Sequence, residues 1–326
     1  MAATTDPPFT ITNTMIERVG EISRRIGTLT VGINMSRNPR LHHANRIRSI
    51  HSSLAIENNT LTLEQVTDII QGKHVLGPPS EIREVKNAFQ AYDLLPSLDP
   101  YSVDDFLHAH KLMTTDLIND TGRFRTTGVG VFSGDTVVHM APPASLVPQL
   151  IGNLFAWAKS SDVHPLIKSC VFHFELEFIH PFIDGNGRMG RLWQTLILSK
   201  WEPLFAWIPI ESLIHESRQQ YYDALGESGK KGSSTYFVEF MLSVISNALN
   251  MYEMDVSRPS VRLSEKEQTI LNLIKANSRI TIADIVEITG YPRSTVTRII
   301  KNMSDNGIIE RVGPKKNGYW MPLPNY

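Results

Sequence analysis

The chain has 326 residues, of which 41% are hydrophobic and 20% charged, and its formal net charge is -1. This composition is typical of a soluble globular protein of about two or three domains, and the balanced charge excludes a whole-chain field that attracts nucleic acid or an anionic membrane. The single cysteine, Cys170, excludes a disulfide framework and a thiolate metal cluster. We therefore expect a cytoplasmic protein with no secretory signal and no membrane span.

The first third of the chain is expected to be helical. Apolar residues recur along it at spacings of three and four, which is the pattern of amphipathic helices. Thr62 with Gln65 three residues later is a capping-box pattern, and Ser80 and Ser102 are expected N-caps. The predicted helices cover residues 11–30, 41–56, 62–71, 80–95 and 102–118.

Residues 121–140 are rich in glycine, threonine and valine, and the pattern changes there from helix to strand. Ser133-Gly134-Asp135 lies between two β-prone runs, which predicts a hairpin over residues 128–140. A small hairpin inside a helical body is typically a flap over a ligand site. Helices are expected again from about Ser145 and over residues 165–179.

The segment from Phe178 to Arg191 is predicted to be a helix, a tight loop and a second helix. Pro181 ends the first helix, and the next helix is expected to begin near Gly187 or Arg188. Gly185 and Gly187 permit positive φ and leave room for a ligand against bare backbone. Free N–H groups at such a helix N-terminus make an anion site.

The side chains of this loop suit phosphoryl chemistry. Arg188 and Arg191 carry guanidinium groups that grip phosphate oxygens in a fork. Asp184 offers a hard oxygen for Mg²⁺, and His180 can take a proton near neutral pH. Together they fit the transfer of a phosphorus group to a hydroxyl. The structural alternative is a plain turn after a helix terminator.

The same run resembles the signature of the Fic family, H-x-F-x-D/E-G-N-G-R-x-x-R. A chance match is on the order of 10⁻¹⁰ per start position at average residue frequencies. The resemblance covers roughly residues 80–250. It implies an all-α fold with a small β-hairpin flap. It also implies the activity of a protein adenylyltransferase, which moves AMP from ATP to a Ser, Thr or Tyr hydroxyl of a target protein. The matching residues are His180, Phe182, Asp184, Gly185, Asn186, Gly187, Arg188 and Arg191.

The resemblance also implies a role for each loop residue. His180 would deprotonate the target hydroxyl, and Asp184 would bind Mg²⁺ on the α- and β-phosphates of ATP. Arg188 would hold the β-phosphate and Arg191 the γ-phosphate. Phe182 would pack beneath the loop. The residues that would cradle the phosphates are Gly185, Asn186 and Gly187.

Two further features of the family have counterparts here. The flap would hold an extended segment of the target by strand addition, through Val137, Val138 and His139. The run that begins at Tyr221 is similar to a later family helix, in which Tyr222 would line the adenine pocket. A core position for that tyrosine is the structural alternative.

Ser53-Leu54-Ala55-Ile56-Glu57-Asn58 resembles the inhibitory motif of the family, S/T-x-x-x-E-G/N. Glu57 would pair with Arg191 and take the guanidinium meant for the γ-phosphate, so that the α-phosphate of bound ATP is wrongly aimed. A solvated helix end is the alternative for Ser53 and Glu57. In some family members this glutamate assists the removal of AMP.

The tail from Arg258 carries 11 basic and 6 acidic residues. Helices are predicted near 263–274, over 282–289 and over 294–303, followed by a hairpin from Gly307 with Lys315 and Lys316 at its tip. This pattern resembles a winged helix-turn-helix domain. Residues 263–322 would therefore bind DNA, with the third helix in the major groove, or would serve as a module for protein docking or dimerisation.

The predicted domains are an N-terminal helical segment with the inhibitory motif (1–80), a Fic catalytic domain (81–255) and a winged helix-turn-helix domain (256–326). The expected substrates are ATP with Mg²⁺ and a target protein, and a homodimer is possible. Two other functions stay open. One is a DNA-binding transcriptional regulator whose Fic body only senses nucleotide. The other is a Fic enzyme that removes AMP or transfers a different phosphate-containing group.

Overall fold

The computed structural model describes residues 6–32, 39–133, 136–257, 263–305, 308–313 and 318–322. The chain forms two compact units, Met1–Glu253 and Met254–Tyr326. The helices of the first unit are α1 (Asn13–Gly32), α2 (Pro39–Ile56), α3 (Leu63–Ile70), α4 (Pro79–Asp93), α5 (Val103–Thr114), α6 (Val147–Ser160), α7 (Pro165–Ile179), α8 (Asn186–Trp201), α9 (Ile210–Glu216), α10 (Arg218–Lys231) and α11 (Thr235–Ser257). Its 3-10 turns are η2 (Leu95–Ser97), η3 (Ala144–Leu146) and η4 (Pro203–Trp207). Strands β1 (Gly130–Ser133) and β2 (Thr136–Met140) pair antiparallel.

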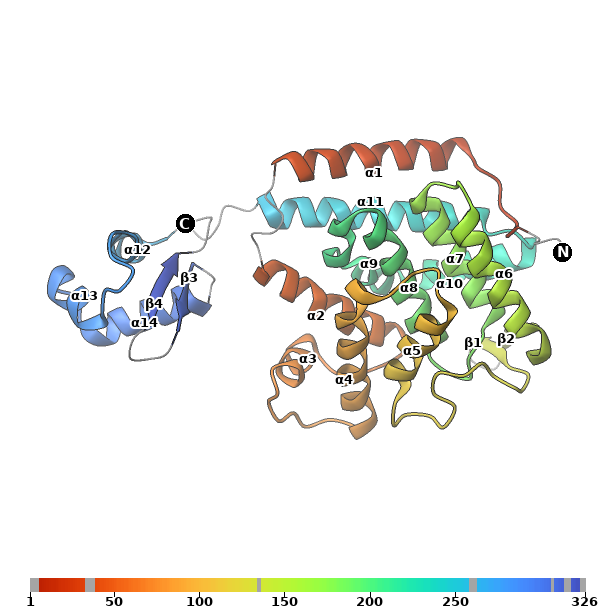
Figure 1. The fold of residues 1–326 in the computed structure, drawn as a ribbon, viewed down its shortest axis with the longest axis horizontal. Coiled ribbons are helices and arrows are strands. Elements are labelled where there is room, and N and C mark those ends of the chain that lie inside the picture. The colour runs from red at the N-terminus through yellow and green to blue at the C-terminus, as the bar shows by residue number, and fades with distance from the viewer. Residues whose placement is uncertain are drawn as a thin grey trace. The chain divides into compact units, whose positions relative to one another are not determined.

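Helices α7 and α8 pack against each other in the core of the first unit (Figure 1). Most residues of both helices are buried, which is characteristic of helices inside a globular core. Phe172 and Trp193 are fully buried, and the Trp193 indole N–H donates to the Pro100 carbonyl at 2.9 Å. The loop between α7 and α8 therefore rests on a rigid base.

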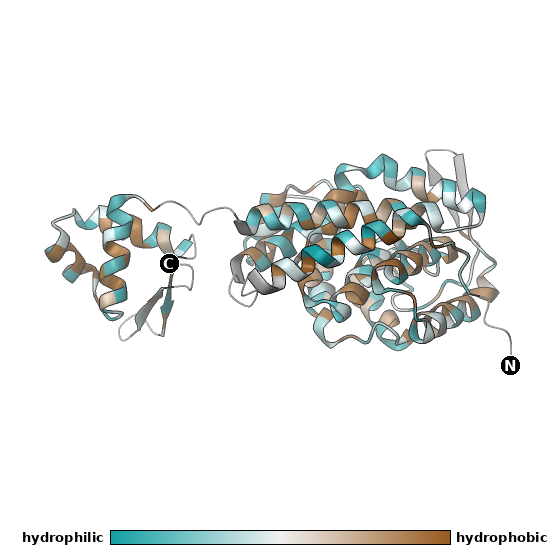
Figure 2. Ribbon diagram, turned by 90° about the horizontal axis from the view of Figure 1, so that it is seen from above, coloured by the Kyte–Doolittle hydropathy of each residue, from teal (hydrophilic) through white to brown (hydrophobic). Residues whose placement is uncertain are grey.

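Helix α1 lies along α11 on one side of this unit (Figure 1). Thr12 donates to Glu239 at 2.6 Å, and Arg25 pairs with Glu253 at 3.3 Å, so the two helices run in the same direction. Figure 2 shows hydrophobic and hydrophilic residues alternating around such surface helices, as expected for helices with one face on a core.

Helix α2 is fixed against α9 by a buried carboxylate. Glu211 accepts hydrogen bonds from the hydroxyls of Ser49 on α2 and Tyr92 on α4, both at 2.7 Å. A buried charge is stabilised by such charge-assisted hydrogen bonds. This contact anchors α2, and with it Ser53 and Glu57 near its C-terminal end.

The second unit is built from α12 (Glu265–Ala276), α13 (Ile282–Thr289), α14 (Arg293–Asp305) and the antiparallel strands β3 (Ile309–Val312) and β4 (Tyr319–Pro322). It has its own core, in which Ile270, Ile285 and Met303 are fully buried. The tip of its hairpin, with Lys315 and Lys316, lies outside the described residues. The expected all-α fold with a flap hairpin and a winged helix-turn-helix is confirmed.

Several local predictions can be compared with these elements. The Thr62–Gln65 capping box and the Ser102 N-cap are confirmed, and α7 has the predicted bounds. The N-cap predicted at Ser80 is wrong. Helix α4 begins at Pro79, whose ring fixes φ for a first helical position and has no N–H to be capped. No helix among the described residues is both long and apolar enough to span a bilayer.

Candidate active site

The loop between α7 and α8 begins with an unusual backbone conformation. His180 caps α7 with φ 50° and ψ 62°, in the left-handed region, which is uncommon for a residue other than glycine. Its N–H donates to the Leu176 carbonyl at 2.9 Å. Gly185, with φ 86°, is the N-cap of α8. The chain thus reverses direction in six residues, which brings His180 close to the N-terminus of α8.

Asn186 and Phe182 hold the loop in shape. The Asn186 amide accepts from the Phe182 N–H and donates to the Phe182 carbonyl, both at 2.9 Å. The Phe182 ring is fully buried and stacks on His110, with ring centroids 3.6 Å apart. The sequence prediction that Phe182 packs beneath the loop is confirmed.

His110 on α5 supports the loop, and it was not among the residues predicted from the sequence. The Gly122 N–H donates to its Nδ1 at 2.9 Å, so Nε2 is the protonated nitrogen and donates to the Asp184 carbonyl at 3.0 Å. Burial lowers the pKa of His110 to about 4. The imidazole is therefore neutral at physiological pH and positions the loop without adding charge to it.

The N-terminus of α8 is covered by the carboxylate of Glu57. A methyl group on Gly187 would lie 2.3 Å from Glu57 Oε1 and 3.0 Å from Arg191 Nη1, so only a glycine leaves room for the carboxylate. An oxyanion here faces the unpaired N–H groups and the positive end of the helix dipole. The structure thus brings Glu57 onto the predicted anion site.

Arg191 is fully buried and fixed by both residues of the inhibitory motif. Its Nη2 donates to Glu57 Oε1 at 2.8 Å and to the Ser53 carbonyl at 3.0 Å, and its Nε donates to Ser53 Oγ at 3.1 Å. Burial is the largest single influence and lowers the pKa of Arg191, but the charge and hydrogen bond of Glu57, together with Coulombic attraction from Tyr221 and Glu177, raise the pKa overall. A buried guanidinium of this kind needs an anionic partner, which is Glu57 in this structure.

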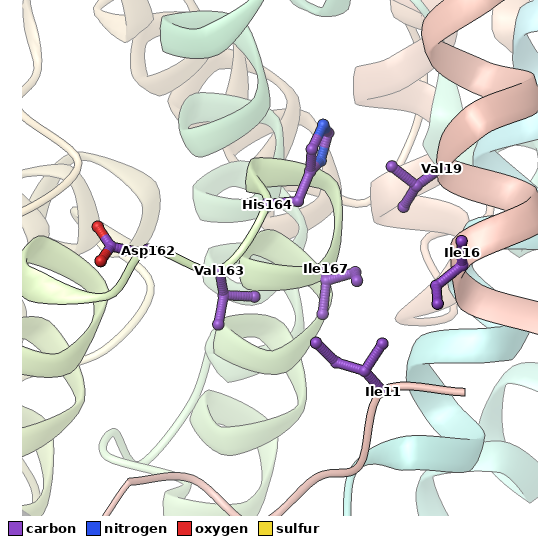
Figure 3. Close-up of a pocket in the computed structure, with 7 residues that line it drawn as sticks. All are labelled: Ile11, Ile16, Val19, Asp162, Val163, His164 and Ile167. Carbon is purple, nitrogen blue, oxygen red and sulfur yellow. The ribbon is translucent and has the colours of Figure 1, made fainter. Parts of the chain in front are cut away.

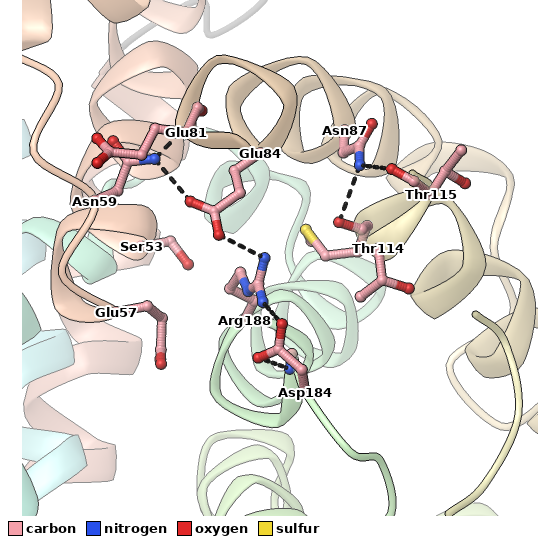
Figure 4. Close-up of polar contacts among 12 residues, drawn as sticks. Ser53, Glu57, Asn59, Glu81, Glu84, Asn87, Thr114, Thr115, Asp184 and Arg188 are labelled. Atoms are coloured by element: carbon pink, nitrogen blue, oxygen red, sulfur yellow. Dashed lines mark hydrogen bonds and ion pairs between the residues drawn. The ribbon is translucent and has the colours of Figure 1, made fainter. Parts of the chain in front are cut away.

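Arg188 is also buried and lies between two carboxylates (Figure 4). Its Nη2 pairs with Asp184 at 2.8 Å and its Nη1 with Glu84 of α4 at 3.5 Å. Glu84 in turn accepts from Asn59 at 2.8 Å, just beyond the end of α2. Glu84 carries no sequence signal for this role, because nothing in the local pattern of α4 relates it to a loop about one hundred residues later.

The two tyrosines of α10 occupy different environments. Tyr221 is buried, and its hydroxyl lies 3.0 Å from His173 Nε2. Tyr222 is 39% exposed and donates to the Ile56 carbonyl at 3.4 Å, so it lies beside the end of α2 that carries Glu57. Tyr221 therefore belongs to the core, whereas Tyr222 does not take the core position that was its structural alternative.

The flap is described as backbone only. In β1 and β2, Val131 pairs with His139 and Phe132 with Val137, and the register shift between them marks a bulge. The predicted hairpin is confirmed. The side chains of Val137, Val138 and His139 lie outside the described part of the structure.

A buried carboxylate lies one turn before His180. Glu177 Oε1 has no hydrogen-bond partner among the described residues, and burial raises the pKa of this carboxyl to about 7. Its sequence signal was a charged residue inside the largely apolar run of α7. Its carboxyl group raises the pKa of Arg191 by Coulombic attraction, and its main-chain carbonyl lies 3.3 Å from His180 Nδ1.

An apolar hollow of about 420 Å³ lies at the opposite end of α7 (Figure 3). It is lined by α1 and by residues around the N-cap of α7, including Ile16, Val19 and His164. A helix of this length separates it from His180 by about 20 Å. The hollow and the loop are therefore separate features.

The loop and the first turns of α8 thus combine a proton acceptor, an oxyanion site at a helix N-terminus and two buried guanidinium groups. Two family models match the chain, the Fic/DOC family over residues 100–198 and the winged helix-turn-helix DNA-binding family over residues 263–310. A solved Fic family protein from Desulfovibrio desulfuricans G20 is 41% identical, with a TM-score of 0.78 over 98% of this chain and 99% of that one. The chain belongs to the Fic family.

Curated relatives match part of the chain. The protein adenylyltransferase Fic of Nematostella vectensis is 28% identical over 221 residues, which are 62% of this chain and 48% of that protein. The protein of the same name from Culex quinquefasciatus is 28% identical over 236 residues, or 68% and 45% of the two chains. The chain spans about half the length of these relatives.

Proposed function

We propose that this protein is an adenylyltransferase that moves AMP from ATP to a Ser, Thr or Tyr hydroxyl of a target protein. The observation that carries the proposal is the loop from His180 to Arg191. This segment carries a proton acceptor, His180, six residues before a helix N-terminus where bare backbone and two guanidinium groups form an oxyanion site. The names of the curated relatives agree with this activity.

In this reaction His180 takes the proton of the target hydroxyl. The hydroxyl oxygen bonds to the α-phosphorus, the bond from that phosphorus to the β-phosphate oxygen breaks, and pyrophosphate leaves. Arg188 holds the β-phosphate and Arg191 the γ-phosphate, while the backbone from Gly185 to Gly187 cradles the chain of phosphates. Tyr222 contributes to the adenine pocket.

The residues present fit a magnesium ion that arrives with the nucleotide. Asp184 is half-exposed, and its carboxylate lies beside the phosphate clamp Arg188. Among the described residues no cluster of three or more His, Cys, Asp or Glu side chains forms a metal cage. Mg²⁺ commonly uses one or two carboxylates together with substrate phosphates, and it would neutralise charge on the α- and β-phosphates here.

Replacement of Asp184 by asparagine is expected to slow AMP transfer about 100-fold, because the lost metal interaction is worth several kcal/mol in the transition state. The rate of labelling by radioactive ATP, measured against magnesium concentration, tests this. Asp120→Asn is the control, since Asp120 is exposed in a loop outside the site. Equal labelling in magnesium and in excess EDTA would contradict a metal role.

Residues 1–80 act in this proposal as an inhibitory segment on the catalytic domain, residues 81–255. The carboxylate of Glu57 binds the guanidinium of Arg191 and covers the backbone of Gly187, where the γ-phosphate would bind. ATP then binds with its α-phosphate displaced from the line of attack. Ser53 adds to this inhibition, because its hydroxyl oxygen and its carbonyl accept hydrogen bonds from the same guanidinium.

The flap presents the target. Strand addition to the edge of the β1–β2 hairpin would align an extended segment of the target past His180, with Val137, Val138 and His139 in contact with it.

A homodimer stays a prediction, and light scattering, which gives the mass of the purified protein in solution, tests it.

The winged-helix unit, residues 256–326, is proposed to contact DNA. Helix α14 turns Val296, Ile300 and Met303 into the core, while Arg298 and Lys301 are exposed on it. This is the arrangement that a recognition helix needs to reach a major groove. The alternative is that this unit docks another protein, and the experiment below distinguishes the two.

Replacement of Arg298 by alanine is expected to weaken binding of genomic DNA fragments and to reduce the slope of log affinity against log salt by about 1 if Arg298 contacts a phosphate. Mobility-shift assays at several salt concentrations measure both quantities. Lys275→Ala on α12 removes a charge from the same unit and serves as the control. An unmodified protein that retards no fragment would leave protein docking as the function of this unit.

A further inference from the structure

Arg125 lies before the flap and is one of the most deeply buried arginines of the first unit, with 2% of its surface exposed. The hydrogen bonds of its guanidinium within the described residues all end on main-chain carbonyl oxygens. Nε donates to His180 at 2.7 Å and Nη1 to Thr127 at 2.9 Å. Nη2 donates to Pro142 at 2.5 Å and to Ile179 at 3.3 Å.

These four carbonyls belong to two places that the catalytic proposal needs to hold together. Ile179 and His180 form the C-terminal end of α7, where the proton acceptor is located. Thr127 precedes β1 and Pro142 follows β2, so they are the two legs of the flap hairpin. One planar guanidinium therefore links the turn at His180 with both legs of the flap.

The main chain reinforces the same link. The N–H of Arg125 donates to the Pro181 carbonyl at 2.9 Å, directly after His180. Carbonyls at the end of a helix lack partners within the helix, and a cation there also interacts favourably with the helix dipole. The left-handed turn at His180 persists only where its surroundings hold it, and Arg125 supplies several of those contacts.

We propose that Arg125 is a positioning residue that fixes the distance between the His180 imidazole and the hydroxyl presented by the flap. The inference rests on the proposed AMP transfer. In the described contacts Arg125 binds the flap and the end of α7, whereas Arg188 and Arg191 on α8 bind other partners. Loss of Arg125 is therefore expected to lower the turnover number and to leave the affinity for ATP unchanged.

The test uses the full chain in a Glu57→Gly background. Arg125→Ala is expected to lower kcat for AMP transfer about 100-fold, as for a displacement near 1 Å, while the Kd for ATP measured by calorimetry stays unchanged. Added guanidinium ion at millimolar concentration is expected to restore part of the activity, because it can refill the cavity and its hydrogen bonds. Arg123→Ala is the matched control, since Arg123 is exposed two residues away.

A second variant keeps the test decisive if Arg125→Ala does not fold. Arg125→Lys retains the charge and most of the volume but lacks the planar fork, so it too is expected to lose turnover, without rescue by guanidinium. Parental turnover in Arg125→Lys would overturn the positioning role. A fall in ATP affinity in step with kcat would do the same, and so would a folded Arg125→Ala that guanidinium does not rescue.

Failure of the proposed function has a different signature. In that case the Glu57→Gly parent itself labels no protein. Hydrogen–deuterium exchange then tests the role of Arg125 without an activity measurement. Arg125→Lys is expected to speed exchange in peptides that cover residues 128–142 and 176–184, and to leave α11 unchanged. Equal exchange in parent and variant would show that Arg125 does not hold the flap to the turn.

Discussion

Glu57→Gly is expected to raise AMP transfer by about 100-fold, because correct aim of the α-phosphate depends on displacements near 1 Å. The substitution removes the carboxylate that holds Arg191 at 2.8 Å and covers the backbone of Gly187. The guanidinium and the helix N-terminus then become available to the γ-phosphate. Self-labelling with radioactive ATP, followed over time, measures the effect.

Asn58→Gly is the matched control for this variant. Asn58 follows Glu57 directly and already has φ 69°, so glycine is accommodated there without strain. Its side chain binds Arg218 and lies outside the Arg191 contacts. If both glycine variants raise labelling equally, loosening of the chain after α2 is responsible, and the ion pair is not the brake.

His180→Ala is expected to reduce AMP transfer by a factor of about 10² to 10⁴, the usual contribution of a general base. The variant keeps Arg188, Arg191 and the backbone of the α8 N-terminus, so ATP should still bind. Labelling in the Glu57→Gly background and calorimetry with ATP measure the two quantities. His108→Ala, which removes an exposed histidine of α5, is the control.

This variant also separates the competing functions. A regulator that only senses nucleotide would respond to ATP as before without His180, whereas an enzyme would lose its product. The intact mass of target or protein after incubation with ATP distinguishes the addition of AMP, the addition of another group and the removal of AMP. Unchanged labelling in His180→Ala would contradict the proposed base.

Much of the fold follows from local patterns. The capping box at Thr62, the N-cap at Ser102 and the hairpin after residue 128 depend on a few neighbouring residues, and the structure agrees with them. The N-cap at Ser80 failed for a local reason too, because Pro79 offers a stronger start to α4. Where a proline start and a serine N-cap compete at neighbouring positions, the local sequence does not show which of them begins the helix.

Local sequence patterns predict only part of the candidate site. The loop from His180 to Arg191 is contiguous, so the sequence alone reveals a proton acceptor, an oxyanion site and two guanidiniums. Glu84 and Arg125 contact the loop from distant parts of the chain, and their roles depend on how α4 and the flap pack. The difference between Tyr221 and Tyr222 likewise depends on which face of α10 meets the core.

The sequence by itself determined the Fic signature, the helical body, the winged helix-turn-helix and the chemistry that the loop residues allow. Only the tertiary structure decided that the Glu57 carboxylate lies on Arg191 and Gly187, and that Arg125 joins the turn at His180 to the flap. The reason is physical. Short-range patterns specify helices and turns, whereas an ion pair or a hydrogen bond between distant residues forms only after packing brings them within about 3 Å of each other.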